Sequence, residues 1–252
     1  YALAFSSVKM LKNLNLWEKI KENAQPIFNI KVTHGTIERG PASANLQFNN
    51  ADIEESPMAQ MLEDRFLRHY LNVEIKKNTL IDIIEQREVY KIIDSEQKKQ
   101  IILNNKSKIE ASLVVASDGI DSPTAKIFGI KKTGWKYKQR GLVCAVDHEH
   151  SSKNTAYQYF LPTGPLAILP IKTNTASIVW TESIQNASTL AEMNDTEFLS
   201  VLRNRFGDFL GHLKLTGKRL SFPLKLSITT KYVSDMFAVV GDAAHGYHPI
   251  AG

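Results

Sequence analysis

The chain has 252 residues, 43% of them hydrophobic, so it is long enough to bury a sizeable core as one large domain or as two interleaved ones. Its formal net charge of +5 comes with lysines that are scattered along the chain, a pattern typical of a solvated surface and not of a nucleic-acid-binding face. The single cysteine, Cys144, excludes an internal disulfide and a multi-cysteine metal centre, and the lack of an apolar run of roughly 18 residues restricts any membrane contact to a peripheral one.

The N-terminal region predicts a helix followed by a hairpin of strands. Apolar residues recur at helical spacing from Ala4 onward, and the helix is expected to end near Ala24 because Pro26 follows. Residues 28–32 then alternate between apolar and polar side chains, as in a half-buried strand. Glycine and proline between positions 35 and 41 indicate a turn into a second strand.

A second helix and a small β-meander are predicted next. Apolar side chains over residues 62–71 share one side of a helix. Strand-like segments follow at residues 80–84, 89–93 and 100–103. This region therefore combines a helix with short strands.

Two short apolar runs, far apart in the chain, each end in an acidic residue beside a glycine. Residues 113–116 lead into Ser117-Asp118-Gly119, and residues 237–240 lead into Gly241-Asp242-Ala243. Such runs are typical of strands buried on both faces, and ligands of open α/β sheets bind beyond the carboxyl ends of these strands. Glycines permit close approach of the backbone, and a carboxylate accepts hydrogen bonds from ligand hydroxyls. We therefore expect the two strand ends to share one ligand.

The segment between these motifs predicts an antiparallel sheet and a helix. Residues 157–161, 166–170 and 176–180 alternate, with glycine and proline at the turns. The helix is expected over residues 196–206, with Asn194 at its cap. A metal site is not predicted, because no third ligand accompanies the two histidines at positions 148 and 150.

Both ends of the sequence indicate an internal piece of a longer protein. Residue 1 is Tyr and not Met, and helical spacing starts at once. At the other end, Gly252 falls where a helix is expected to begin after the Gly-Asp motif. We therefore expect further sequence on both sides.

With these motifs assembled, the chain resembles the flavin-dependent aromatic hydroxylases of ubiquinone biosynthesis, within the class-A flavoprotein monooxygenases. The resemblance lies in Asp118-Gly119, in Gly241-Asp242-Ala243 with His248-Pro249 after it, and in residues 164–170 and 222–224, which are similar to the 2-octaprenyl-6-methoxyphenol hydroxylase branch. The family's Gly-x-Gly-x-x-Gly fingerprint does not occur in the chain, and Lys126 stands in the region where the family has an arginine.

The resemblance implies a fold, a domain division and a set of site residues. The implied fold is α/β: an incomplete Rossmann-like FAD-binding domain interleaved with a mixed or antiparallel sheet domain, as in p-hydroxybenzoate hydroxylase. The FAD-binding domain would comprise residues 1–24, 62–130 and 231–252, and the substrate domain residues 25–61 and 131–230. The implied FAD-binding residues are Asp118, Gly119, Gly241, Asp242, Ala243, Pro249 and Gly252. The implied substrate-lining residues are Tyr159, Leu161, Ile168, Leu169 and His248, and no catalytic acid or base is assigned.

The implied activity is hydroxylation of the phenol ring of a polyprenylated ubiquinone precursor, with FAD, NAD(P)H and O2. This activity implies that the full-length protein lies in the cytoplasm at the inner membrane surface. Other proteins of ubiquinone biosynthesis are expected as partners there, and nucleic acid is not expected to be a partner. The present sequence alone is expected to be inactive. The alternatives are a flavoprotein of the same fold that acts on another aromatic or isoprenoid substrate, and a non-catalytic scaffold subunit.

Overall fold

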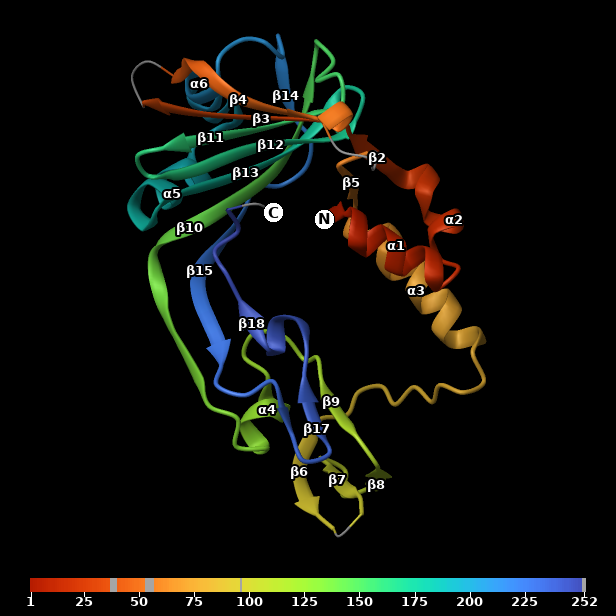
Figure 1. Cartoon of the computed structure of the whole chain (residues 1–252). Coiled ribbons are helices and arrows are strands. Elements are labelled where there is room, and N and C mark those ends of the chain that lie inside the picture. Colours follow the sequence, from red (N-terminus) through yellow and green to blue (C-terminus); the bar gives the residue numbers. More distant parts are fainter. Residues whose placement is uncertain (37–39, 53–56, 96, 251–252) are drawn as a thin grey trace. The chain divides into compact units, whose positions relative to one another are not determined.

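A computed structural model describes residues 1–36, 40–52, 57–95 and 97–250 of the chain (Figure 1). Its contacts divide the chain into two compact units. Unit 1 comprises residues 1–79 and 138–223 with Ile250, and unit 2 comprises residues 80–137 and 224–249. The helical residues 1–24 and 62–79 thus group with the antiparallel sheet. The domain division implied by the resemblance, which concerns the role of each part, stays a prediction.

The N-terminal helix of unit 1 is broken, contrary to the single helix that the spacing predicted. After strand β1 (Ala2–Ala4), helix α1 spans Phe5–Asn13 and α2 spans Trp17–Ile20, followed by a 3-10 turn, Lys21–Asn23. Asn15 separates the two helices in the left-handed conformation, with φ of 56°, which asparagine tolerates better than most residues. The break buries Leu16, Trp17 and Ile20 together and leaves Leu14 exposed. Tertiary packing therefore overrides the helical spacing.

A three-stranded sheet and a long helix complete this part of unit 1. The sheet has the order β1-β5-β2, with β2 at Ala24–Ile27 and β5 at Ala59–Leu62. Helix α3 spans Asp64–Lys77, so it begins two residues later and ends six residues later than predicted. Phe66, Leu67 and Tyr70 pack on the cluster that holds Trp17.

The predicted antiparallel sheet is confirmed (Figure 1). The strands lie in the order β18-β15-β10-β13-β12-β11-β3-β4, with β14 also paired to β10; β10 and β15 each contribute to both units. The strand bounds are β3 Asn29–Thr36, β4 Gly40–Asn49, β10 Lys132–His148, β11 Thr155–Leu161, β12 Gly164–Lys172, β13 Thr175–Ser183, β14 Leu213–Leu215, β15 Leu220–Thr229 and β18 His245–Gly246. Strand β3 forms the expected hairpin with β4 and pairs in parallel with β11.

The main core of unit 1 lies between this sheet and two helices. Helix α5 spans Ile184–Glu192, and α6 spans Asp195–Phe206. The Asn194 side chain accepts a hydrogen bond of 2.9 Å from the Glu197 backbone N–H, so the predicted cap is confirmed. Alternate residues of the strands pack on Phe198, Leu202 and Phe206 of α6.

Unit 2 contains two small sheets. The first consists of β6 (Val89–Asp94), β7 (Lys99–Leu103) and β8 (Lys108–Ala111). The strand predicted at residues 80–84 is wrong: the segment is not regular and Leu80 is 91% exposed, because no neighbouring strand pairs with it in the described structure.

The second sheet has the order β16-β17-β9, with β9 at Val114–Ala116, β16 at Val233–Ser234 and β17 at Phe237–Val239. A short helix α4, Pro123–Ile127, follows β9. The Phe128 ring stacks on Phe237 with centroids 3.9 Å apart. Val115 is exposed, so in the described structure β9 is not buried on both faces as predicted.

Candidate functional site

The Asp-Gly and Gly-Asp motifs leave the same edge of one sheet. Strands β9 and β17 pair in parallel, with Ala116 opposite Val239 (Figure 1). The Val240 backbone N–H donates a hydrogen bond of 3.0 Å to the Ala116 carbonyl, which extends the pairing to the first residue beyond β17. Because parallel strands point their carboxyl ends the same way, both turns begin side by side. The predicted meeting of the two strand ends is confirmed.

Asp118 organises the turn that follows β9. Its carboxylate accepts hydrogen bonds from the Ser122 hydroxyl, at 2.5 Å, and from the Thr124 backbone N–H, at 2.9 Å. Partial burial pushes the pKa of this carboxyl upward, but the hydrogen bonds from Ser122 and Thr124 together outweigh burial and leave the pKa below its ordinary value. Gly119 has a φ of 87°, and no atom lies within 4 Å of where a Cβ would stand. Hydrogen bonds to Asp118 therefore hold the turn in place, and the space in front of Gly119 is free of other protein atoms.

The Gly-Asp turn after β17 presents a free carboxylate. Gly241 begins a 3-10 turn, Gly241–Ala243, with a φ of 58° and open space in front of its Cα. The Asp242 side chain is exposed, and its carboxylate has no hydrogen-bond or ion-pair partner within the described ranges. Ala243 is fully buried, so its side chain packs inward. Asp242 is thus available to a ligand, whereas Ala243 supports the turn.

The residues after Gly-Asp pack on the residues after Asp-Gly. A Cβ on Gly246 would lie 2.3 Å from Cδ1 of Ile120, so a larger residue there would require the Ile120 side chain to move. The His248 ring lies edge-on to Tyr137, with centroids 5.1 Å apart, and burial lowers the pKa of His248. Nδ1 of His245 and Nδ1 of His248 are both buried without a hydrogen-bond partner in the described part of the chain. Such orphaned atoms are rare in native structures unless a ligand or water satisfies them.

Two predicted FAD-binding residues lie at the C-terminal limit of the described chain. Pro249 is half-buried directly after His248. Gly252 lies outside the described residues, so its predicted role stays a prediction.

The predicted substrate-lining residues of the sheet point to two opposite faces. Tyr159, Leu161 and Ile168 belong to the core against α5 and α6, and the exposed fraction of Ile168 is 0%. Leu169 lies on the other face, beside the cluster of Ile27, Met61 and Ala156. Period-two alternation explains the split, since neighbouring residues of a strand cannot share a face. Tyr159, Leu161 and Ile168 are therefore buried in the core of the described structure, and the substrate-lining role of all four sheet residues stays a prediction.

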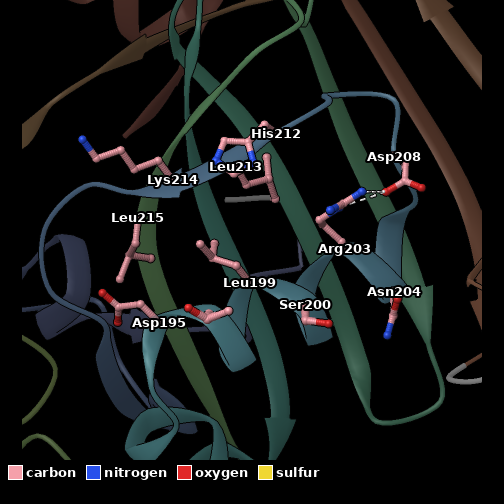
Figure 2. Close-up of a pocket in the computed structure, with 11 residues that line it drawn as sticks. Asp195, Leu199, Ser200, Arg203, Asn204, Asp208, His212, Leu213, Lys214 and Leu215 are labelled. Carbon is pink, nitrogen blue, oxygen red and sulfur yellow. Dashed lines mark hydrogen bonds and ion pairs between the residues drawn. The ribbon is translucent and has the colours of Figure 1, made fainter.

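A cavity of about 640 Å³ lies in unit 1 between α6 and β14 (Figure 2). Arg203 and Asp208 at its edge are paired, with Nη2 and Oδ1 2.6 Å apart. None of its lining side chains carries a buried polar atom without a partner. Size alone does not make it the functional site.

A smaller cavity in unit 2 was missed by the sequence interpretation. Its volume is about 310 Å³, and it lies beside the Asp-Gly turn. Lys132, Lys136 and Lys225 line it together with Asp121. The sequence interpretation treats all lysines as solvated surface residues, because sequence spacing gives no sign that Lys132 and Lys225 line the same cavity. Folding alone brings these charges together.

Comparison with known proteins identifies the family to which the chain belongs. A family model described as an FAD binding domain matches residues 2–252. The chain belongs to this FAD-binding-domain family. The match confirms the predicted cofactor class, FAD, for the family.

Two curated relatives are hydroxylases, one named for ubiquinone and the other for demethoxyubiquinol. Ubiquinone hydroxylase UbiL of Rhodospirillum rubrum is 32% identical over 252 residues, which are 100% of this chain and 57% of that protein. The 3-demethoxyubiquinol 3-hydroxylase of Escherichia coli is 26% identical over 252 residues, 100% of this chain and 63% of that protein. The chain thus spans about three fifths of the length of these relatives. The resemblance drawn from the sequence is confirmed.

A solved structure shows the same fold. PqsL of Pseudomonas aeruginosa, described as a probable FAD-dependent monooxygenase, superposes with a TM-score of 0.78 at 18% identity, covering 99% of this chain and 70% of that chain. This likeness confirms the predicted fold class.

The turns fit the chemistry of FAD. An exposed unpaired carboxylate at Asp242 suits the donor hydroxyls of a ribityl chain, and the open positive-φ glycines suit close approach of a ligand. The orphaned Nδ1 atoms of His245 and His248 supply polar groups that a ligand can satisfy. In the described residues no group of three metal-binding side chains was found, and no helix there is long and apolar enough to cross a membrane.

Proposed function

We propose that the full-length protein carrying this chain is an FAD-dependent monooxygenase that hydroxylates the phenol ring of a polyprenylated ubiquinone precursor. The observation that carries the proposal is the parallel pairing of β9 with β17, which delivers Asp118-Gly119 and Gly241-Asp242 to one edge. The names of the two relatives, a ubiquinone hydroxylase and a demethoxyubiquinol hydroxylase, support the substrate class.

The proposed reaction balances with one reductant and one O2. The phenol ring ArH, O2, NAD(P)H and a proton yield ArOH, H2O and NAD(P)+. One oxygen atom enters the new C–O bond and the other leaves as water, while the reduced nicotinamide supplies two electrons. Bound FAD would supply the redox chemistry that links hydride transfer to oxygen insertion.

The chain's own residues bind and orient the cofactor in this proposal. Asp242 accepts hydrogen bonds from cofactor hydroxyls, because an ionised carboxylate only accepts. Gly119 and Gly241 let the backbone approach the cofactor, and Asp118 keeps its turn rigid through Ser122 and Thr124. His248, neutral over a wider pH range because burial lowers its pKa, lines the substrate side. Pro249, directly after His248, would line the flavin ring.

The substrate's polyprenyl tail places the reaction at a lipid surface. We propose contact with the cytoplasmic face of the inner membrane, in association with other ubiquinone-biosynthesis proteins, because the tail partitions into the bilayer. Co-sedimentation of the full-length protein with liposomes of mixed phosphatidylethanolamine and phosphatidylglycerol tests this, and a protein that stays in the supernatant would contradict it.

Two measurements on the full-length protein separate this function from its alternatives. Flavin absorbance after purification excludes the scaffold role. NAD(P)H oxidation that is stimulated by polyprenyl phenols, with hydroxylated product, but not by simple hydroxybenzoates identifies the ubiquinone branch. The reverse preference would assign the protein to another aromatic substrate.

A further inference from the structure

Strand β4 is the outermost strand at one edge of the large sheet of unit 1 (Figure 1). Within the described residues it pairs with β3 alone. Every residue from Ser43 to Phe48 is exposed, so the described elements leave this part of the strand open to solvent. An open edge strand presents main-chain N–H and C=O groups that can pair with another strand.

The pairing with β3 shows which main-chain groups of β4 are free. The Asn50 N–H donates a hydrogen bond of 2.9 Å to the Phe28 carbonyl. Bonded and non-bonded pairs alternate along an antiparallel ladder, so the even-numbered residues before Asn50 also bond to β3. The main-chain groups of Asn45 and Gln47 therefore point away from the sheet.

The free stretch of β4 is short and is closed at both ends. On one side, the pairing with β3 shifts register just before Asn45, which interrupts the regular strand. On the other side, the Asn49 N–H donates a hydrogen bond of 3.1 Å to the Asp52 carboxylate. The free main-chain groups of Asn45 and Gln47 thus flank Leu46 symmetrically.

This edge lacks the charges that protect many sheet edges. Residues 40–51 contain no charged side chain, although 23% of the residues in the chain are charged. The two outer strands of the β6-β7-β8 sheet, by contrast, carry Lys91, Asp94, Lys108 and Glu110. A charge on an edge strand opposes pairing with a second strand. The composition of β4 therefore favours such pairing.

Apolar side chains of β4 indicate how a second strand would fit. Ala44, Leu46 and Phe48 lie on one face of the strand, and the exposed fractions of Leu46 and Phe48 are 67% and 48%. In an antiparallel pair of two β4 strands centred on Leu46, this leucine meets its own copy. The large Phe48 side chain then lies opposite the small Ala44 of the second copy, so the two faces are complementary.

We propose that β4 pairs in antiparallel orientation with β4 of a second copy of this chain, with the two-fold axis at Leu46. Asn45 then lies opposite Gln47 of the second copy, and each such pair exchanges two main-chain hydrogen bonds. A two-fold interface requires a patch that is complementary to itself, and an uncharged strand whose free groups flank Leu46 symmetrically meets this requirement. The inference does not depend on the proposed function.

Cross-linking of the full-length protein tests the register. Leu46→Cys places two thiols across the axis, where the Cα atoms of a non-hydrogen-bonded pair lie about 4.5 Å apart, within disulfide range. Phe48→Cys is the matched control on the same face, because its copy lies four residues further along the ladder, roughly 14 Å away. Cys144 is buried in both variants. Under mild oxidation, Leu46→Cys should give a disulfide-linked dimer on a non-reducing gel, and Phe48→Cys should not.

An exchange of charge tests the contact itself. Sedimentation velocity at about 1 to 100 µM should show a monomer–dimer equilibrium for the unchanged full-length protein. Leu46→Lys and Leu46→Glu should each raise the dimer dissociation constant at least about tenfold, since like charges then meet at the axis. An equimolar mixture of these two variants should dimerise more tightly than either alone. Leu14→Lys adds the same charge at an exposed leucine outside this sheet and should leave the dissociation constant unchanged.

Several results would overturn the inference. They are a monomer at every concentration, equal cross-linking of the two cysteine variants, a dimer that Leu46→Lys does not weaken, and a mixture no tighter than the single variants. If another segment of the full-length protein or a different protein covers β4, Leu46→Cys will not cross-link and the inference fails. Melting temperatures verify that each variant is folded. Flavin occupancy and hydroxylation of a polyprenyl phenol test the proposed function separately.

Discussion

Asp242→Asn in the full-length protein should weaken FAD binding without weakening the fold. The Asp242 carboxylate is exposed and has no partner within the described residues, so the substitution breaks no contact of the folded chain. An amide of the same shape loses the negative charge and half of the acceptor capacity.

The size of the effect follows from the hydrogen bonds that a charged acceptor makes. Such bonds contribute about 1.5–3 kcal/mol each, and the neutral amide oxygen of asparagine keeps part of the free energy of one bond. We therefore expect a loss of about 1.5–2 kcal/mol, or roughly a 10- to 30-fold higher dissociation constant. Quenching of flavin fluorescence during titration of the apoprotein measures it.

Asp118→Asn is the matched control, because this carboxylate is already used inside the protein. It accepts hydrogen bonds from Ser122 and Thr124, so the same chemical change should lower the melting temperature. An Asp242→Asn protein with an unchanged FAD dissociation constant would refute the reasoning. So would an Asp242→Asn protein that is destabilised as much as Asp118→Asn.

Three further outcomes follow from burial and from pKa shifts. Ile168→Ala should cost about 2–5 kcal/mol of unfolding free energy, measured in urea, since the residue is fully buried. A change in substrate KM at unchanged stability would contradict this and would support the predicted substrate-lining role of Ile168. Burial raises the pKa of Cys144 to about 12, so a disulfide reagent should modify it only on unfolding, and rapid labelling of the native protein would contradict this. Because the pKa of Asp118 is lowered in the folded protein, the ionised carboxylate stabilises the fold above the unfolded pKa near 3.8, and this stabilisation is lost as the pH falls through the folded pKa. Acid unfolding of Asp118→Asn should lack this pH-dependent loss. Identical acid-unfolding curves for the variant and the unchanged protein would contradict the assignment.

Local sequence patterns were sufficient to predict the strands that pack on helices with one face only. Residues 157–161, 166–170 and 176–180 alternate with period two, and the sheet forms there because one face meets α5 and α6. The cap of α6 was predictable for the same reason, since Asn194 acts on a neighbour three residues away. The glycine and aspartate of each turn were likewise visible in the sequence.

Only the tertiary structure decided which residues share a surface. Alternation reveals that Ile168 and Leu169 lie on opposite faces, but not which face the helices cover. Asn15 interrupts a helical pattern because burying Leu16 and Trp17 together outweighs the spacing. The pairing of Lys225 with Asp121 joins residues far apart in the chain, and no periodic signal encodes such a contact. The sequence by itself determined the local conformations and the chemical groups at the turns, whereas long-range packing decided how those groups combine into a site.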